Sequence, residues 1–452
     1  MHVFGSSGVR GVAGEELTPQ DVMQVAQAAG SVWADDTDRV AVARDTRTTG
    51  QTYENAASSG LTGLGFDVDR LGIVPTPGLQ AYCEREGVPG LMVTASHNPA
   101  AYNGIKLIGD DGVELTRDVL DRVEAALAGE PQNVAWDRVG ADRRVESARR
   151  HYREGVLAAV DRERIADADL TVVVDPGHGA GALVSPDLFR ELGCRVHTVN
   201  AQADGHFPGR DPEPVPANLE ELRAYVAATD ADLGIAHDGD GDRAMFVDGN
   251  GEHIDGSAMF AALAAAELEE GDGVVSAVNA SQRLVDVVEA AGATLSLTPI
   301  GSTYIVSRIR ALQDSGTNVA IAGEGNGGIL FPEYRIARDG AYTAARVCEL
   351  VAETPARELV APYDDYYNVR RNLSVEDEAT REAMLAGIAS HAEDAAADLD
   401  TTDGYRLDYG DGWVLARPSG TEPVVRVYAE ARSYDRAEEL ATQMVAAAEN
   451  RL

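Results

Sequence analysis

The sequence predicts an α/β fold, and two observations support this. Short apolar runs rich in Val, Ile and Ala recur along the chain, each followed by a Gly/Asp/Ser-rich turn and then an Ala-rich stretch with helical spacing. The runs at 40–43, 172–174 and 274–278 do not alternate with polar residues, as expected of strands buried in a parallel sheet. With 452 residues, of which 44% are hydrophobic, the chain is long enough for several packed domains.

Three further apolar runs, at 91–94, 233–236 and 318–322, each end in an unusual polar loop. Ligands of open α/β sheets bind beyond the carboxyl ends of the strands. The pattern therefore predicts three similar units whose loops converge on one cleft.

Acidic segments compatible with helix, at 138–160, 252–271 and 353–365, lie between these units and are candidate joints. The last part of the chain has a different pattern. It predicts a helix at 376–399, a strand pair through 405–416, a strand at 424–429 and a closing helix from Tyr434, which together read as a small α+β domain. The predicted division of the chain is 1–148, 149–250, 251–360 and 361–452.

The charge balance argues against nucleic acid and membrane surfaces as partners. Acidic residues number 75 and basic residues 38, which gives a net charge of −37. Such a chain repels phosphate backbones and anionic lipid. Lys106 is the only lysine, so the basic residues are otherwise arginine. An acidic, lysine-poor surface predicts adaptation to high salt, where ions screen the self-repulsion; GC-rich codon usage is the alternative reason for the missing lysines.

The cysteines predict a reducing compartment. Cys83, Cys194 and Cys348 are odd in number and far apart in sequence, which fits neither a disulfide framework nor a thiolate metal site. The chain has no uncharged apolar run of about 18 residues and does not open like a signal peptide. We therefore expect it in the cytoplasm.

The segment DGDGDR at 238–243 follows a buried strand and carries Asp238, Asp240 and Asp242 at alternating positions. An extended backbone would turn all three carboxylates to one side. Oxygen ligands alone favour a hard cation, most readily Mg²⁺. An EF-hand is excluded because Arg243 and Gly249 stand where that loop needs Gly and Glu, and an ordinary Asp-Gly turn is the structural alternative.

The segment TASHNP at 94–99 also leaves a buried strand, and the only lysine, Lys106, follows shortly after. Ser96 lacks the nucleophile elbow of acyl hydrolases. An oxyanion beside a metal and a cation suits phosphoryl transfer instead. The alternative is that Ser96 caps a helix N-terminus. Retention of one lysine in so arginine-rich a chain favours a functional role, since lysine is a compact donor whose pKa can be lowered.

Two other segments offer phosphate contacts. The turn RPSGTEP at 417–423, with Arg426 after it, offers hydroxyls, backbone amides and guanidinium groups. Because it has no base or metal ligand, it predicts a binding site for a phosphate that does not react. The segment GSSGVRG at 5–11 lacks the ending of a P-loop, and its Arg10 is the candidate cation for the transferring group.

The segment GEGNGG at 323–328 offers one carboxylate, Glu324, and one amide, Asn326, which suits recognition of sugar hydroxyls. The segment GHGAG at 177–181 does not match dinucleotide-binding spacing and is interpreted as a close-packed turn.

Together these segments resemble the α-D-phosphohexomutase superfamily of phosphoglucomutases, phosphomannomutases and phosphoglucosamine mutases. The family's signatures occur here in order, at 4–11, 94–99, 238–243, 323–328 and 417–423. The resemblance implies three related α/β domains with mixed sheets around a central cleft, and a smaller C-terminal α+β domain. It also implies a mobile last domain, one Mg²⁺ per chain and a hexose 1,6-bisphosphate as primer.

The resemblance also assigns roles to residues. It implies that Ser96 carries a phosphoryl group and that its phosphate completes a metal site with Asp238, Asp240 and Asp242. Arg10, His97 and Lys106 would surround the reacting group. The implied substrate contacts are Arg243, Glu324, Asn326, Arg417, Ser419, Gly420, Thr421 and Arg426.

The implied reaction interconverts hexose 1-phosphates and 6-phosphates through phosphoserine 96 and a bisphosphate that turns end over end. Many bacterial members have a His at the position of Gly328, so the general base falls to His97 or Lys106. The Asn-Gly-Gly form is typical of archaeal members. The opening motif favours glucosamine phosphate, with glucose or mannose phosphate as alternatives.

Two other classes of function fit the same residues. A metal-dependent sugar phosphatase would release inorganic phosphate, and an inactive sugar-phosphate sensor would bind without turnover. The expected partners are small sugar phosphates, and the chain is expected to be a monomer or a homodimer.

Overall fold

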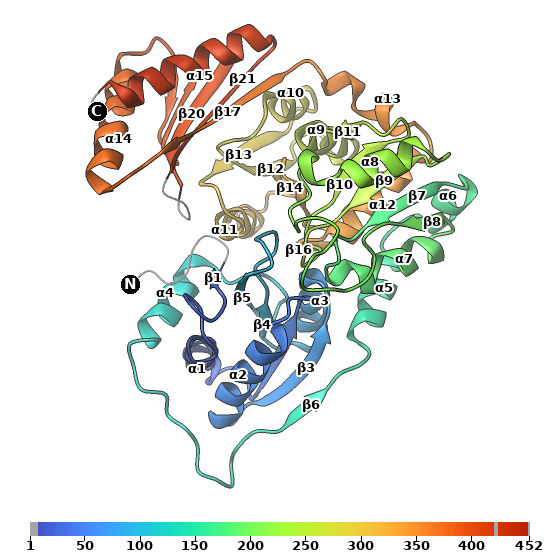
Figure 1. Ribbon diagram of the computed structural model, residues 1–452, viewed down its shortest axis with the longest axis vertical. Coiled ribbons are helices and arrows are strands. Elements are labelled where there is room, and N and C mark those ends of the chain that lie inside the picture. The colour runs from blue at the N-terminus through green and yellow to red at the C-terminus, as the bar shows by residue number, and fades with distance from the viewer. Residues whose placement is uncertain (1–7, 420–423, 451–452) are drawn as a thin grey trace. The chain divides into compact units, whose positions relative to one another are not determined.

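The computed structural model describes residues 8–419 and 424–450, and its contacts divide the chain into two compact units. Unit 1 comprises residues 1–256 and 321–359, and unit 2 comprises 257–320 and 360–452. Figure 1 shows the elements of both units. No helix within the described ranges is long and apolar enough to cross a bilayer.

Unit 1 begins with a mixed six-stranded sheet in the order β1-β5-β4-β2-β3-β6. Strands β2, β3, β4 and β6 run parallel, and β5 pairs antiparallel with β4 and β1. The strands are β1 Val9–Val12, β2 Arg39–Arg44, β3 Asp67–Ile73, β4 Gly90–Val93, β5 Tyr102–Ile108 and β6 Asp142–Arg144. The helices are α1 Pro19–Trp33, α2 Gly50–Gly63, α3 Thr76–Glu86, α4 Arg117–Ala126, α5 Ala148–Ala158 and α6 Arg162–Asp167.

Both faces of this first sheet are buried, which explains why the predicted strand at 40–43 is apolar throughout. Val40 and Val42 pack with α1, α2 and α4 on one face, whereas Ala41 and Ala43 pack with α3 and α5 on the other. The carboxyl ends of β2 and β4 consequently lie side by side, since the two strands pair in parallel.

A second mixed sheet follows, in the order β11-β10-β9-β7-β8. Strands β7, β8 and β9 are parallel, and β10 and β11 are antiparallel additions. Its strands are β7 Thr171–Asp175, β8 Arg195–Thr198, β9 Leu233–Ala236, β10 Met245–Asp248 and β11 His253–Ile254. Its helical segments are η1 Ala180–Leu183, α7 Ser185–Glu191, η2 Pro216–Asn218 and α8 Glu220–Ala227.

Residues of the third predicted domain fall into both units. Unit 1 contains the antiparallel strands β14 Val319–Glu324 (from Ile321 onward), β15 Gly328–Phe331 and β16 Arg335–Arg338, with α12 Gly340–Val351 and α13 Ala356–Val360, which ends at the unit boundary. Unit 2 contains the parallel pair β12 Gly273–Ala277 and β13 Thr294–Thr298, with α9 Gly256–Glu267 (from Ser257 onward), α10 Gln282–Ala290 and α11 Ser302–Asp314.

The rest of unit 2 is a five-stranded antiparallel sheet in the order β17-β21-β20-β19-β18. Helices α14 and α15 pack against it in one apolar core, and Figure 1 shows α15 running along the strands. The elements are η3 Ala361–Tyr363, β17 Tyr367–Ser374, α14 Glu378–Asp394, β18 Asp398–Asp400, β19 Tyr405–Asp408, β20 Gly412–Pro418, β21 Val424–Ala431 and α15 Tyr434–Glu449. This is the predicted α+β domain.

The structure corrects two details of that domain. The predicted helix at 376–399 ends at Asp394, because Ala395 is already extended and strand β18 begins at Asp398. Strand β17 was not predicted, since six of its eight residues are exposed and it carries polar side chains on an edge of the sheet. All three cysteines are buried free thiols.

Candidate active site

Ser96 lies in a tight loop that follows β4 and is 1% exposed. Its backbone has a φ of +50°, which is unusual for a residue with a side chain. The Ser96 amide donates to Thr94 Oγ1 at 2.8 Å, and a turn closes from the Asn98 amide to the Ala95 carbonyl. No helix begins here, so the interpretation of Ser96 as a helix cap is wrong. Its hydroxyl instead donates to Asp238 Oδ2 at 2.7 Å.

The three aspartates follow β9 and are buried, at 0 to 1% exposed. One carboxylate oxygen from each lies within 4.8 Å of the others, so the sequence correctly predicted that they converge. The predicted extended backbone is wrong, however, because residues 239–241 form a turn in which Gly241 has a φ of +69°. The convergence therefore arises from a compact loop and not from the alternation of side chains along a strand.

Both glycines of the DGDGDR segment are explained by this loop. Gly241 takes a left-handed conformation that favours glycine. Gly239 lies against the serine loop, where a Cβ would be 2.6 Å from the Ser96 carbonyl oxygen. The two loops can therefore touch only because residue 239 has no side chain.

Lys106, on β5, supplies positive charge to the aspartates. Its Nζ lies 2.7 Å from Asp240 Oδ2 and 2.8 Å from Asp242 Oδ2. Burial lowers the pKa of Lys106, but the charges of Asp240 and Asp242 outweigh burial and raise it. The two aspartates thus favour the ammonium form of the lysine. Thr76 adds a hydroxyl donor to Asp240 Oδ2 at 2.5 Å.

The aspartates fit a divalent cation. Within the described residues, Asp240 Oδ1 and Asp242 Oδ1 are buried without a hydrogen-bond partner. Burial, together with the charges of Asp242 and Asp240, raises the pKa of Asp238 to about 8. A cation would relieve both the unpartnered oxygens and the mutual repulsion, and a set of oxygen ligands alone suits Mg²⁺.

His97 and two arginines border the serine. His97 Nδ1 lies 3.3 Å from Ser96 Oγ and 3.1 Å from Arg243 Nη2. The charge of Arg243, together with burial and the charge of Arg10, holds the pKa of His97 far below its usual range, so its imidazole is neutral. Because Arg243 can only donate, His97 Nδ1 is the unprotonated nitrogen. Arg10 donates to Asn98 Oδ1 at 3.1 Å.

The GEGNGG segment forms the β14–β15 hairpin and lies next to the aspartate loop. The Ala244 amide donates to the Gly327 carbonyl at 3.0 Å. Asn326 Oδ1 accepts from the Gly328 amide at 3.0 Å, so the amide side chain shapes the hairpin turn. A Cβ at Gly328 would lie 2.8 Å from Arg338 Cδ. The glycine at this position therefore leaves room for an arginine.

Arg338 is a site residue that the sequence interpretation missed. Its guanidinium lies 2.8 Å from Asp242 Oδ2 and 3.5 Å from Glu114 Oε1. Burial lowers the pKa of Arg338, but the negative charges of Asp242 and Glu114 outweigh burial and raise the pKa of Arg338 overall. In sequence it is one arginine of many, and only its place just before the Asp339 N-cap of α12 sets it apart.

A second missed group lies behind the serine loop. Asp45 and Arg47 follow β2 at its carboxyl end, and Arg47 bonds the serine loop from its buried side. The rule that drew attention to the other polar loops, namely polar residues directly after a buried strand, would also have found this pair. In the second sheet, Arg210 similarly bonds Asp175 and the His237 carbonyl at the base of the aspartate loop.

The segment predicted to bind the non-reacting phosphate, at 417–426, lies in unit 2. Arg417 on β20 and Arg426 on β21 are direct cross-strand partners, so they share one face of the sheet. Asp403 Oδ2 lies 2.9 Å from Arg417 Nε and also accepts from the Ile300 amide at 3.0 Å. The Ser419 amide donates to the Val424 carbonyl. The predicted contacts Gly420 and Thr421 lie outside the described residues.

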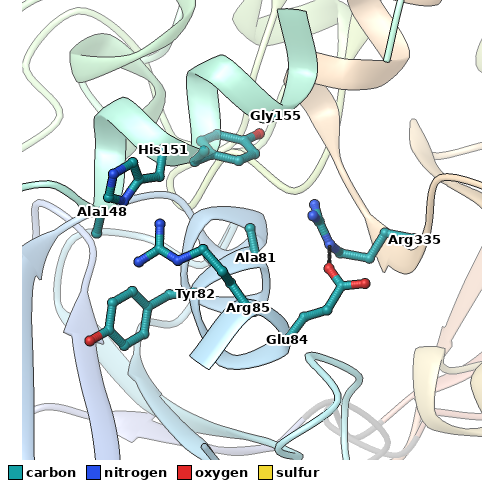
Figure 2. A pocket seen from close by; sticks show the side chains of 9 residues that line it. Ala81, Tyr82, Glu84, Arg85, Ala148, His151, Gly155 and Arg335 are labelled. Carbon is teal, nitrogen blue, oxygen red and sulfur yellow. Dashed lines mark hydrogen bonds and ion pairs between the residues drawn. The ribbon is translucent and has the colours of Figure 1, made fainter. Parts of the chain in front are cut away.

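A cavity of about 280 Å³ lies elsewhere in unit 1, between α3 and α5 (Figure 2). Arg85 and His151 face one another across it, and Arg335 reaches Glu84 at 2.8 Å at the other side. None of the predicted site residues lines it. The chemistry therefore gathers in the loops around Ser96 and not in this cavity.

Four family models match the chain in succession. They describe phosphoglucomutase/phosphomannomutase alpha/beta/alpha domains I, II and III, at residues 1–134, 150–251 and 254–366, and the C-terminal domain at 371–447. Two archaeal relatives are each 40% identical to the chain. One is the phosphoglucomutase/phosphomannomutase of Thermococcus kodakarensis, aligned over 97% of this chain and 96% of the relative. The other is a probable phosphoglucosamine mutase of Methanopyrus kandleri, aligned over 98% and 96%.

A solved structure agrees with the sequence matches. The crystal structure of a phosphoglucomutase/phosphomannomutase family protein from Burkholderia thailandensis superposes with a TM-score of 0.85 at 28% identity, covering 99% of this chain and 97% of the other. The chain therefore belongs to the phosphoglucomutase/phosphomannomutase family, as shown by the four successive domain matches and the relatives that align over nearly its whole length.

Proposed function

We propose that this chain is a hexose phosphate mutase that transfers a phosphoryl group between the 1- and 6-positions of a hexose by way of Ser96. The observation that carries the proposal is the 2.7 Å hydrogen bond from Ser96 Oγ to Asp238, one of three converging buried aspartates. Phosphoryl transfer needs positioning and charge neutralisation more than covalent chemistry. A serine beside a carboxylate cluster and several cations supplies both.

Ser96 is the phosphoryl carrier in this proposal. The bond from phosphorus to Ser96 Oγ breaks as a bond from phosphorus to the free sugar hydroxyl forms, and the hydroxyl proton passes to a base. The charges of Asp240 and Asp242 favour the ammonium form of Lys106, whereas His97 is neutral and its Nδ1, which accepts from Arg243 Nη2, is unprotonated. His97 is therefore the proposed base. The negative charge of the phosphoryl group counteracts the effect of Arg243 and Arg10 on its pKa.

Asp238, Asp240 and Asp242, with the phosphate on Ser96, are the proposed ligands of one Mg²⁺ per chain. When bound, the ion neutralises the carboxylates and polarises the phosphoryl group. Arg10 and Arg243 lie close enough to the serine loop to contact the phosphoryl oxygens, and Lys106 reaches the same cluster through Asp240 and Asp242.

The second phosphate of the substrate needs a site without a base. We assign it to the cross-strand pair Arg417 and Arg426 and to the loop between them, with Ser419, Gly420 and Thr421. Glu324 and Asn326 are the proposed contacts to the sugar hydroxyls. A hexose 1,6-bisphosphate primes Ser96, and the same bisphosphate is the intermediate that turns over between the two transfers.

Glucosamine phosphate is the proposed preferred substrate, with glucose and mannose phosphates as competitors. The chain's relatives carry both kinds of name, and its opening motif resembles phosphoglucosamine mutases. The proposed domains are 1–148, 149–250, 251–360 and 361–452. The buried free thiols and the acidic composition support a reducing cytoplasm and small sugar phosphates as partners.

A coupled assay in high salt with the 1-phosphates of glucosamine, glucose and mannose tests the function. Ser96→Ala should lose about 4 kcal/mol of transition-state stabilisation, about a thousandfold in rate. Ser31→Ala, which removes a hydroxyl on α1, is the matched control and should turn over normally. Near-normal turnover of Ser96→Ala would reject the covalent route.

The same assay separates the alternatives. Release of inorganic phosphate in step with loss of substrate would identify a phosphatase, and binding of all three sugars without conversion would identify a sensor. Intact mass spectrometry should show one phosphate on the wild-type chain after exposure to the bisphosphate and none on Ser96→Ala.

A further inference from the structure

Arg47 is a buried arginine that lies behind the serine loop and bonds to its backbone. It follows Asp45 and Thr46 at the carboxyl end of β2, and its side chain is 0% exposed. A guanidinium removed from water is costly unless each of its donors finds an acceptor. The surroundings of Arg47 meet that condition.

The five N–H donors of Arg47 have five acceptors. Nε donates to Asp45 Oδ2 at 3.1 Å, and the four Nη donors reach backbone carbonyls of the serine loop. These carbonyls belong to Ser96 at 2.9 Å, Asn98 at 2.6 Å, Pro99 at 2.7 Å and Tyr102 at 2.9 Å. A lysine has three donors on one atom and cannot bond five acceptors spread over a planar fork.

The same carboxylate also fixes the start of the loop. Thr94 Oγ1 donates to Asp45 Oδ2 at 2.7 Å and accepts the Ser96 amide at 2.8 Å. Asp45 thus holds Arg47 on one side and Thr94 on the other. Between these two anchors the loop has to turn sharply, and Ser96 adopts its left-handed backbone there.

Arg47 also contacts the domain that carries the aspartates. Its guanidinium lies 5.2 Å from the centre of the Phe207 ring, and its backbone bridges to Gly205. A Cβ at Gly205 would be 2.2 Å from the Thr46 carbonyl oxygen, so the contact is between backbones. One side chain therefore joins the loop of Ser96 to the domain of Asp238.

We propose that Arg47 is a positioning residue for phosphoryl transfer: it holds the serine loop so that Ser96 Oγ is aimed at the aspartate cluster. Arg47 does not touch the substrate in this proposal and acts through the backbone of residues 96–102. The inference rests on the mutase function proposed above.

The test compares Arg47→Lys with the wild-type chain in the mutase assay, using the sugar 1-phosphate that the wild type converts best. A displacement of the serine of about 1 Å should lower kcat about a hundredfold. KM should stay within about threefold, because the proposed contacts to the second phosphate and to the sugar hydroxyls are unchanged. Rates are normalised to chains that carry phosphate on Ser96, counted by intact mass. Arg39→Lys is the matched control. It alters the ion pair between Arg39 and the buried Asp69 at the opposite end of β2, and it should keep wild-type kcat.

A folded Arg47→Lys with kcat within about twofold of wild type would overturn the proposal. If that variant does not fold, Thr94→Val and Thr94→Ser decide the question. Loss of kcat of at least about tenfold in Thr94→Val with recovery in Thr94→Ser supports the anchored loop, and equal rates in all three proteins refute it. A wild-type chain that converts none of the sugar phosphates would reject the proposed mutase function itself, a result separate from any of these ratios.

Discussion

The carbonyl oxygen of Ser96 lies so close to Gly239 that a Cβ on Gly239 would be 2.6 Å away. The serine loop and the aspartate loop, which come from different domains, therefore meet backbone to backbone. This contact brings Ser96 Oγ within hydrogen-bond reach of Asp238.

Gly239→Ala should separate the two loops. Because real Cβ atoms do not approach a carbonyl oxygen so closely, one loop has to move, and a shift of about 1 Å should lower kcat about a hundredfold. Gly155→Ala is the control, since a Cβ there meets no other part of the protein and should stabilise α5 by about 0.5–1 kcal/mol. Unchanged kcat in Gly239→Ala would show that the contact does not matter for transfer.

Lys106→Met should make the protein depend more strongly on Mg²⁺ for stability. Removing the ammonium leaves Asp240 and Asp242 without their shared partner, which should cost about 3–5 kcal/mol of unfolding free energy. A cation at the aspartates should restore part of this, so added Mg²⁺ should raise Tm more in the variant than in wild type. The exposed Arg150→Met should change stability by less than about 1 kcal/mol. Equal Tm gains with Mg²⁺ in the two proteins would argue against a cation site at these aspartates.

Acid should destabilise the fold through His237. Burial lowers the pKa of His237 to about 4, whereas an unfolded histidine titrates near 6.5. The unfolded state therefore binds a proton first as the pH falls, and the stability contributed by the neutral histidine is lost between pH 6.5 and 4, by about 3 kcal/mol.

His237→Gln, which lacks this titration, isolates the effect. Denaturation by urea at pH 7 and near pH 4.5, at constant salt and Mg²⁺, should show wild type losing more stability than the variant as the pH falls. Parallel losses in both proteins would mean that His237 is not the group responsible.

The sequence predicted which side chains lie together better than it predicted the backbone that brings them together. The runs before Ser96 and Asp238 were identifiable because buried parallel strands are uniformly apolar, and the loops after them carry Ser96 and the three aspartates. The turn at 239–241 was not predictable from alternation, because its conformation depends on a neighbouring loop that is distant in sequence.

Arg338 escaped sequence interpretation for a different reason. It is one arginine in a chain rich in arginine, and its importance comes from the carboxylates that the fold brings to it. The end of α14 at Asp394 was missed because the helical spacing continues past the residue where the backbone becomes extended. Partners in space, not local pattern, decide these features.

Glu430→Gln should weaken unit 2. Glu430 is 0% exposed and accepts from Ser281 Oγ at 2.8 Å, the Gln282 amide at 2.6 Å and Arg283 at 3.3 Å. Loss of its charge removes the ion pair between Glu430 and the buried Arg283 guanidinium, at a cost of about 3 kcal/mol in urea denaturation. Combining it with Arg283→Met should cost less than the sum of the two single changes, and strict additivity would show that the pair is not coupled.

High salt should stabilise the protein. A net charge of −37 repels itself, and molar salt shortens the range of that repulsion to about 3 Å. Tm should therefore rise by several degrees between low and multimolar KCl. A Tm that stays level or falls across that range would leave arginine-favouring codon usage as the reason for the composition.

The burial of Lys106 determines which reagents can modify the side chains on the protein surface. Lys106 is the only lysine in the sequence, and its ammonium is enclosed at 2% exposure between two aspartates. Lysine acetylation, lysine ubiquitination and cross-linking through lysine all need an accessible lysine amine, and Lys106 does not offer one. Attachment to a surface, labelling with a dye or covalent regulation of this enzyme through side chains has to use carboxylate, guanidinium or hydroxyl chemistry instead.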